Sequence, residues 1–217
     1  MNKVTIYVLA NDPQLRPYAH VIKKEASEAV RIIAALIPLT EVDIVIMHSP
    51  GNIAFGVTSG TANGKHRVTI ALNGKHKHFK KRLRVDLRKS LAHGLYHSVR
   101  MQKNGYYHTL VDDIIGEGLA IHFEIEVAGS KPPTCYVSLK NEAFAKIVAR
   151  AKKEFYSVDF DYDDWFHGSK KRTIPRFTGY SIGYHLIKRL LKANPGLAPS
   201  HLVAKKSKKL VDEIALL

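Results

Sequence analysis

The sequence predicts an α+β protein in which an N-terminal lobe, with a mixed sheet and one long helix, precedes a mainly helical C-terminal lobe. Two patterns point to this class. Strand-like alternation and turn residues dominate residues 1–75, whereas apolar residues recur at helical spacing over most of residues 76–217. At 217 residues, the chain suits a single domain in which both lobes share one core.

The N-terminal lobe alternates strands with a single helix. Strands are expected at about residues 3–10, 42–46, 53–57 and 67–73, and Asn73-Gly74 favours a turn after the last of them. A helix is expected over about residues 15–37, with an apolar face formed by Ala19, Ile22, Ala26, Ala29, Ile33 and Leu36. Pro38 ends this helix.

The C-terminal lobe reads as a series of helices. The strongest pattern is an apolar residue every four positions, which predicts a helix through about residue 103 from Leu83, Leu87, Leu91, Leu95 and Val99. Further helices are expected at about residues 109–127, 138–155, 179–193 and 199–215. Residues 157–178 lack periodicity and are expected to form a long loop, of a length that is often functional.

Composition narrows the class of protein. Apolar residues make up 45% and charged residues 24%, as in an ordinary globular domain, and no apolar run is long enough to span a bilayer. The single cysteine, Cys135, excludes an internal disulfide framework and a cysteine-based zinc site. The expected location is the cytoplasm.

The formal charge of +15 is high for this length. It fits general solubility, or a polyanionic partner such as nucleic acid or an acidic protein surface. The basic residues gather in two segments, residues 75–84 and 205–209. Grooves that bind nucleic acid usually add aromatic side chains, and the first segment offers only Phe79. The net charge and these two basic segments support an alternative hypothesis, a basic module that binds nucleic acid or acidic proteins and has a structural zinc site.

His93 and His97 stand four residues apart on the helix expected through residue 103. Side chains at this spacing lie one turn apart on one face, so both imidazoles can reach the same ion. An isolated pair of this kind is also compatible with two surface histidines. Its position beside Leu91, Leu95 and Val99, which form the apolar stripe, favours the metal-binding interpretation.

A hydrolytic zinc site needs a third protein ligand and an open position for water. Glu117 lies on the next helix between Gly116 and Gly118. Glycines inside a helix cost about 1 kcal/mol each relative to alanine, and they allow a neighbouring helix to approach closely. Asp113, one turn earlier, fits either a carboxylate that orients a ligand histidine or an acid that favours the positive end of the helix dipole.

Three segments together resemble a known family. Residues 91–100 (LAHGLYHSVR), 113–124 (DIIGEGLAIHFE) and 174–184 (IPRFTGYSIGY) are similar to predicted zinc-dependent proteases grouped as a domain of unknown function, which are themselves similar to gluzincin peptidases. The resemblance covers about residues 65–195 and implies a zincin-like fold, peptide or protein substrates, and a Zn²⁺ ion held by His93, His97 and Glu117.

The sequence departs from the family pattern at one position. Where the HExxH motif has the glutamate that acts as general base, this chain has Gly94, which cannot transfer a proton. The resemblance therefore implies a metallopeptidase-like protein whose hydrolytic activity is impaired. Three explanations stay open: an inactivated variant of an active peptidase, a protein that kept its metal site for structure or binding, or another acid, Asp113 or Glu124, acting instead.

The third segment adds Tyr180 and Tyr184, one helical turn apart. A tyrosine hydroxyl near a metal can stabilise an oxyanion, and Tyr180, nearer the loop, is the preferred candidate; aromatic packing is the competing interpretation. By analogy with gluzincins, the strand at residues 67–72 is expected at the sheet edge, where it could bind an extended peptide. Weaker candidates for lining the cleft are His108, Trp165 and His167.

Overall fold

The computed structural model describes residues 4–49, 56–137, 139 and 141–216. It confirms the α+β class, with one mixed four-stranded sheet and a majority of helix among these residues. Contacts divide the chain into two compact units. The first comprises residues 1–103 and 123–130, and the second comprises residues 104–122 and 131–217. The prediction of a single domain remains a prediction.

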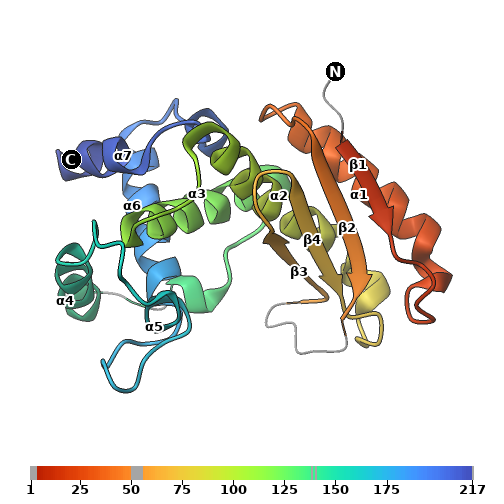
Figure 1. Ribbon diagram of the computed structural model, residues 1–217, viewed down its shortest axis with the longest axis horizontal. Coiled ribbons are helices and arrows are strands. Elements are labelled where there is room, and N and C mark those ends of the chain that lie inside the picture. The colour runs from red at the N-terminus through yellow and green to blue at the C-terminus, as the bar shows by residue number, and fades with distance from the viewer. Residues whose placement is uncertain (1–3, 50–55, 138, 140, 217) are drawn as a thin grey trace. The chain divides into compact units, whose positions relative to one another are not determined.

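The first unit holds the sheet, whose strand order is β1-β2-β4-β3 (Figure 1). β1 and β2 pair in parallel, β2 and β4 also pair in parallel, and β3 pairs antiparallel with β4. The strands are β1 Val4–Val8, β2 Val42–His48, β3 Thr58–Ala62 and β4 Arg67–Leu72. Of the strand expected at residues 53–57, residues 53–55 lie outside the described residues, and the observed strand β3 begins after it.

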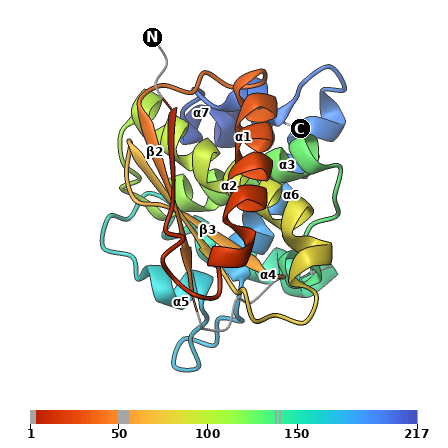
Figure 2. The same ribbon diagram turned by 90° about the vertical axis from the view of Figure 1, so that its right-hand side faces the viewer.

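Two helices of the first unit lie on one face of this sheet (Figure 2). They are α1 (Ala19–Ala34), preceded by the 3-10 turn Arg16–Tyr18, and α2 (Phe79–Asn104). Alternate residues of the two central strands point to this face and are buried, as in Ile44 and Ile46 of β2 and Val68 and Ile70 of β4. The core of the unit therefore lies between the sheet and these helices.

The expectation that β4 is an edge strand is wrong. Its backbone pairs with β2 on one side and with β3 on the other, so both of its hydrogen-bonding edges are used. β3 is the outer strand beside it in the described sheet. Sequence periodicity identifies a strand but does not say which neighbours it pairs with.

The second unit is mainly helical. It contains the first part of α3 (Leu110–Ala128), whose last residues belong to the first unit. The remaining elements are the 3-10 turn Thr134–Val137, α4 (Asn141–Lys152), α5 (Tyr162–Phe166), α6 (Thr178–Ala193), the 3-10 turn Pro199–Leu202 and α7 (Ser207–Ala215). The helix expected over residues 199–215 is thus two pieces.

The segment expected to be a loop, residues 157–178, contains the short helix α5. Its N-cap is Asp161, whose side chain accepts a hydrogen bond from the backbone N–H of Asp164 at 3.2 Å. The apolar side chains Trp165 and Phe166 anchor the helix in the interior, both fully buried. A helix of five residues is too short to show a periodic apolar pattern.

Candidate metal centre

α2 carries both histidines in a largely buried stretch of helix. His97 is 6% exposed, and the apolar residues of the stripe beside the pair are buried. The Nε2 atoms of His93 and His97 lie 3.1 Å apart, so both rings point to one spot. Ligand atoms on a tetrahedral zinc ion lie about 3.3 Å apart, given Zn–N distances of about 2.0–2.1 Å. The pair is therefore not two solvent-exposed surface histidines.

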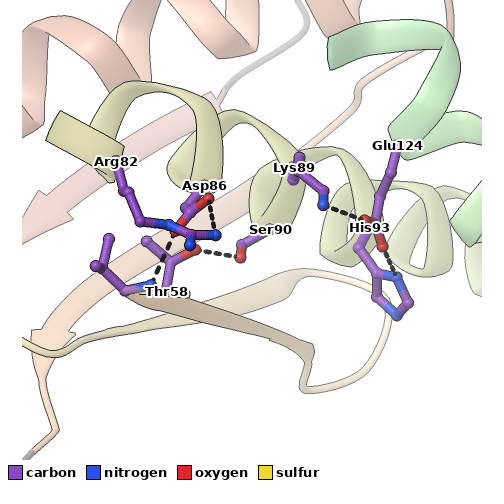
Figure 3. Close-up of polar contacts among 8 residues, drawn as sticks. Thr58, Arg82, Asp86, Lys89, Ser90, His93 and Glu124 are labelled. Atoms are coloured by element: carbon purple, nitrogen blue, oxygen red, sulfur yellow. Dashed lines mark hydrogen bonds and ion pairs between the residues drawn. The ribbon is translucent and has the colours of Figure 1, made fainter. Parts of the chain in front are cut away.

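His93 is oriented by a carboxylate on α3. Its Nδ1 lies 2.7 Å from Oε1 of Glu124, and Nζ of Lys89 lies 3.9 Å from Oε2 of the same carboxylate (Figure 3). A carboxylate accepts hydrogen bonds, so Nδ1 of His93 donates, and in the neutral imidazole Nε2 then keeps its lone pair. Histidines that bind metals commonly donate their other N–H to a carboxylate in this way. The sequence suggests Glu124 only as an acid that could replace the missing general base. Its partner in the structure, His93, lies 31 residues away in the chain.

Glu117 sits where two helices approach closely. A Cβ atom on Gly118 would lie 2.3 Å from the carbonyl oxygen of Gly183 in α6, and one on Gly183 would lie 2.1 Å from that of Ile114. On the other flank, a Cβ on Gly116 would lie 2.8 Å from the ring of Tyr107. The glycines beside Glu117 thus allow close packing, as the sequence predicts. The Glu117 residue itself is 9% exposed.

A second carboxylate lies one turn before Glu117. Burial, together with the negative charges of Glu117 and Asp112, raises the pKa of Asp113 to about 7. Thr109 caps the start of this helix, because its Oγ1 accepts the backbone N–H of Asp112 at 3.4 Å and donates to Asp112 Oδ2 at 2.7 Å. Asp113 is therefore a proton-holding group near neutral pH rather than a simple helix-dipole acid.

Tyr180 belongs to an aromatic cluster in the second unit. Its ring stacks on Tyr136 at 4.5 Å between centroids and meets Phe166 edge-on at 5.1 Å. Its hydroxyl shares a hydrogen bond with that of Tyr162. Burial raises the pKa of both tyrosines, and the charge of Glu117 adds to the effect. Both hydroxyls therefore stay protonated within the influence of Glu117.

Tyr162 was missed because its segment showed no periodicity. The signal that could have found it is the run of acids around it, since Asp161 caps α5 and Asp163 and Asp164 occupy its first turn. Tyr184 has a different role. Its ring stacks on His122 at 4.7 Å between centroids, and its carbonyl oxygen is 3.0 Å from Nε2 of that histidine. Aromatic packing thus explains Tyr184.

The three weaker cleft candidates have different surroundings within the second unit. Trp165 is fully buried, donates from Nε1 to Glu154 at 3.2 Å and lies under Arg172. Arg172 in turn bonds Glu154 and Asp164, so Trp165 belongs to an internal network. His108 and His167 are exposed.

The basic segment at residues 75–84, which includes the start of α2, does not offer an aromatic platform. Phe79 is 3% exposed and packs on Tyr18 at 5.0 Å between ring centroids, so nucleic-acid bases could not stack on it. Two of its cations are paired, with Arg82 bonded to Asp86 at 2.9 Å and Arg84 3.4 Å from Glu25. The structure gives this segment no feature specific to nucleic acid.

One group of side chains in the described part of the chain can hold a metal ion. A ligand atom from each of His93, His97 and Glu117 lies within 4.8 Å of the others. Two imidazole nitrogens and one carboxylate oxygen form a donor set suited to Zn²⁺, with a fourth position left for water or substrate. The residues present therefore fit a zinc ion.

Among the described residues, no helix combines the length and the apolar character needed to cross a membrane. No curated protein and no solved structure matches the chain significantly. A family model described as Predicted Zn-dependent protease (DUF2268) matches residues 19–212. This match extends beyond both ends of the resemblance seen at residues 65–195. The chain belongs to this family of predicted zinc-dependent proteases.

Proposed function

We propose that the chain is a metallopeptidase-like protein that binds one Zn²⁺ ion through His93, His97 and Glu117. The observation that carries the proposal is the convergence of these three ligand atoms within 4.8 Å, in a chain of a predicted zinc-dependent protease family. The bond from His93 to Glu124 supports it, because a neutral imidazole that donates from Nδ1 keeps a lone pair on Nε2, and this Nε2 lies 3.1 Å from that of His97.

Peptides or proteins are the proposed ligands of the site. The family description supports this substrate class. β3, the outer strand of the described sheet, is a suitable place for an extended peptide to add by main-chain hydrogen bonds. Tyr180, held neutral and bonded to Tyr162, is the proposed donor to an oxyanion formed near Glu117.

Hydrolysis is proposed to be impaired in the chain as it stands. A zinc peptidase needs a base that takes the proton of the attacking water, and Gly94 has no side chain to do so. Glu124 is already engaged by His93 and Lys89, which supports a positioning role for it. Zinc supplies Lewis acidity when bound, and the chain's own residues orient it and the substrate.

The experiment is metal analysis followed by hydrolysis assays on one preparation. Protein stripped with a chelator and reloaded should hold about one zinc per chain, and His97→Ala and Glu117→Ala should each lose it. His108→Ala, which changes an exposed histidine, is the matched control and should keep it. A reloaded parent chain without zinc, or ligand variants that bind zinc as well as the parent, would contradict the proposal.

A further inference from the structure

One face of α2 contacts β3, β4 and the segments beside them through residues spaced four apart. At its N-terminal end, Asp86 Oδ2 accepts the backbone N–H of Val57 at 2.9 Å. One turn later, Ser90 Oγ lies 2.6 Å from Thr58 Oγ1, and Figure 3 shows both anchors on the same side of the helix. β3 is thus held against the first half of α2.

The second half of α2 is anchored on the same face. Ser98 Oγ donates to the carbonyl oxygen of Lys65 at 2.7 Å. One turn further, Gln102 Nε2 donates to the same oxygen at 2.6 Å and to the carbonyl oxygen of Thr40 at 3.0 Å. Polar contacts therefore fix the distance between helix and sheet on both sides of residue 94.

Gly94 lies in the middle of this face of α2, four residues after Ser90 and four before Ser98. A Cβ atom there would lie 2.6 Å from Cγ1 of Val68, a contact that real side chains do not make. Val68 is fully buried on β4, between Ile44 of β2 and Ala62 of β3 in register. A β-branched side chain has few alternative rotamers, so its methyl group cannot easily retreat. β3 packs equally closely on α2, since a Cβ on Gly60 would lie 2.4 Å from the carbonyl oxygen of Ser90.

We propose that Val68 fills the space that a side chain at position 94 would need, so that a general-base glutamate can return there only if Val68 is shortened as well. This inference rests on the proposed function, because it concerns the residue next to His93. The absence of a general base at position 94 then depends on two residues that pack together, Gly94 in α2 and Val68 in β4. A single change back to glutamate would not restore a working site.

The packing is tested without any metal, by thermal unfolding of Gly94→Ala, Val68→Ala and the double variant. In an unconstrained helix, glycine to alanine is stabilising. Here Gly94→Ala should lower the unfolding temperature by at least about 3 °C, whereas in the Val68→Ala background the same change should leave it equal or higher. A stabilising effect of Gly94→Ala alone would overturn the proposal.

A second experiment compares the unfolding temperature and the peptide cleavage of Gly94→Glu with those of Gly94→Glu/Val68→Ala. Val85→Glu is the control, since it adds the same charge to an exposed position of α2. Gly94→Glu alone should unfold well below the parent and cleave no peptide, and shortening Val68 should recover most of the unfolding temperature. Peptide cleavage by Gly94→Glu alone, or its unfolding at the parent's temperature, would contradict the inference.

The zinc content of the parent chain separates this inference from the proposed function. If the parent binds no zinc, the proposed function fails, and the coupling between residues 94 and 68 is still read from unfolding. If the parent binds zinc but the two substitutions act independently on stability, only the present inference fails.

Discussion

Nδ1 of His93 lies 2.7 Å from Oε1 of Glu124, a contact between α2 and the last turns of α3. It fixes which nitrogen of His93 faces His97. α3 thus carries two carboxylates with different contacts, since Glu117 is grouped with the histidines as a candidate metal ligand and Glu124 accepts a hydrogen bond from one of them.

The first prediction follows from this contact. Glu124→Gln should weaken zinc binding by about 10–100-fold, as does loss of other carboxylates that orient metal-binding histidines. An amide can still accept from Nδ1 but carries no charge, so Glu124→Ala should weaken binding more than Glu124→Gln. Competition with a chromophoric chelator measures both. Glu28→Gln, a change at an exposed acid of α1, is the control, and equal affinity in all variants would remove Glu124 from the site.

The second prediction concerns Asp113 in metal-free protein. Its carboxyl loses a proton near pH 4 when unfolded but only at about pH 7 when folded. The free energy of unfolding therefore falls as the pH rises between these two values, and the full loss is reached above about pH 7. Asp113→Asn should raise the free energy of unfolding at pH 8 by roughly 2 kcal/mol, about half of what the full shift implies, because the carboxylate is only partly buried.

Urea unfolding at pH 4 and pH 8 measures this dependence. At pH 4 the variant and the parent should differ little, because the carboxyl is protonated in the folded parent. Asp159→Asn, which changes an exposed acid, is the control, and its free energy of unfolding should differ from that of the parent by the same amount at both pH values. A difference that is the same at both pH values would show that Asp113 is not held protonated.

The third prediction concerns the contact between α3 and α6. Gly118→Ala should destabilise the protein by about 1–3 kcal/mol, because its Cβ would lie 2.3 Å from a backbone oxygen that cannot move alone. The gain in helix propensity, about 1 kcal/mol, is too small to offset a larger clash. Gly196→Ala is the matched control, since nothing lies within 4 Å of its Cβ position. Similar denaturation midpoints for both variants would refute this account of the glycines.

The fourth prediction concerns the tyrosine pair. Tyr162→Phe and Tyr180→Phe should each cost about 1 kcal/mol of stability, and the double variant should cost less than the sum, because the two hydroxyls bond each other. A double-mutant cycle by urea unfolding measures the coupling. Additive losses would mean that the hydroxyls do not interact.

Local patterns explain which parts of the fold the sequence predicts. The sequence predicts α2 because apolar residues repeat over many of its turns, and it predicts α3, Leu110–Ala128, to within a few residues. The two histidines and Glu117 are candidates from the sequence alone because helical spacing and flanking glycines are local features, and the structure groups the three side chains. α5, with five residues, offers too little repetition.

Contacts between distant residues explain what the sequence could not predict. The order of the strands depends on pairing across the sheet, and β3 contains Gly60 and no large apolar residue, so it forms a strand only against β4. The partner of Glu124 is 31 residues away, and the obstacle to a side chain at Gly94 is Val68 on another element. None of these partners leaves a local signature.

X-ray absorption spectroscopy of the zinc-loaded chain tests the central claim most directly. We expect four nitrogen or oxygen ligands at about 2.0–2.1 Å, with outer-shell scattering from two imidazole rings. A sulfur ligand at about 2.3 Å, which only Cys135 or a methionine could supply, would contradict it, and so would a spectrum without imidazole scattering.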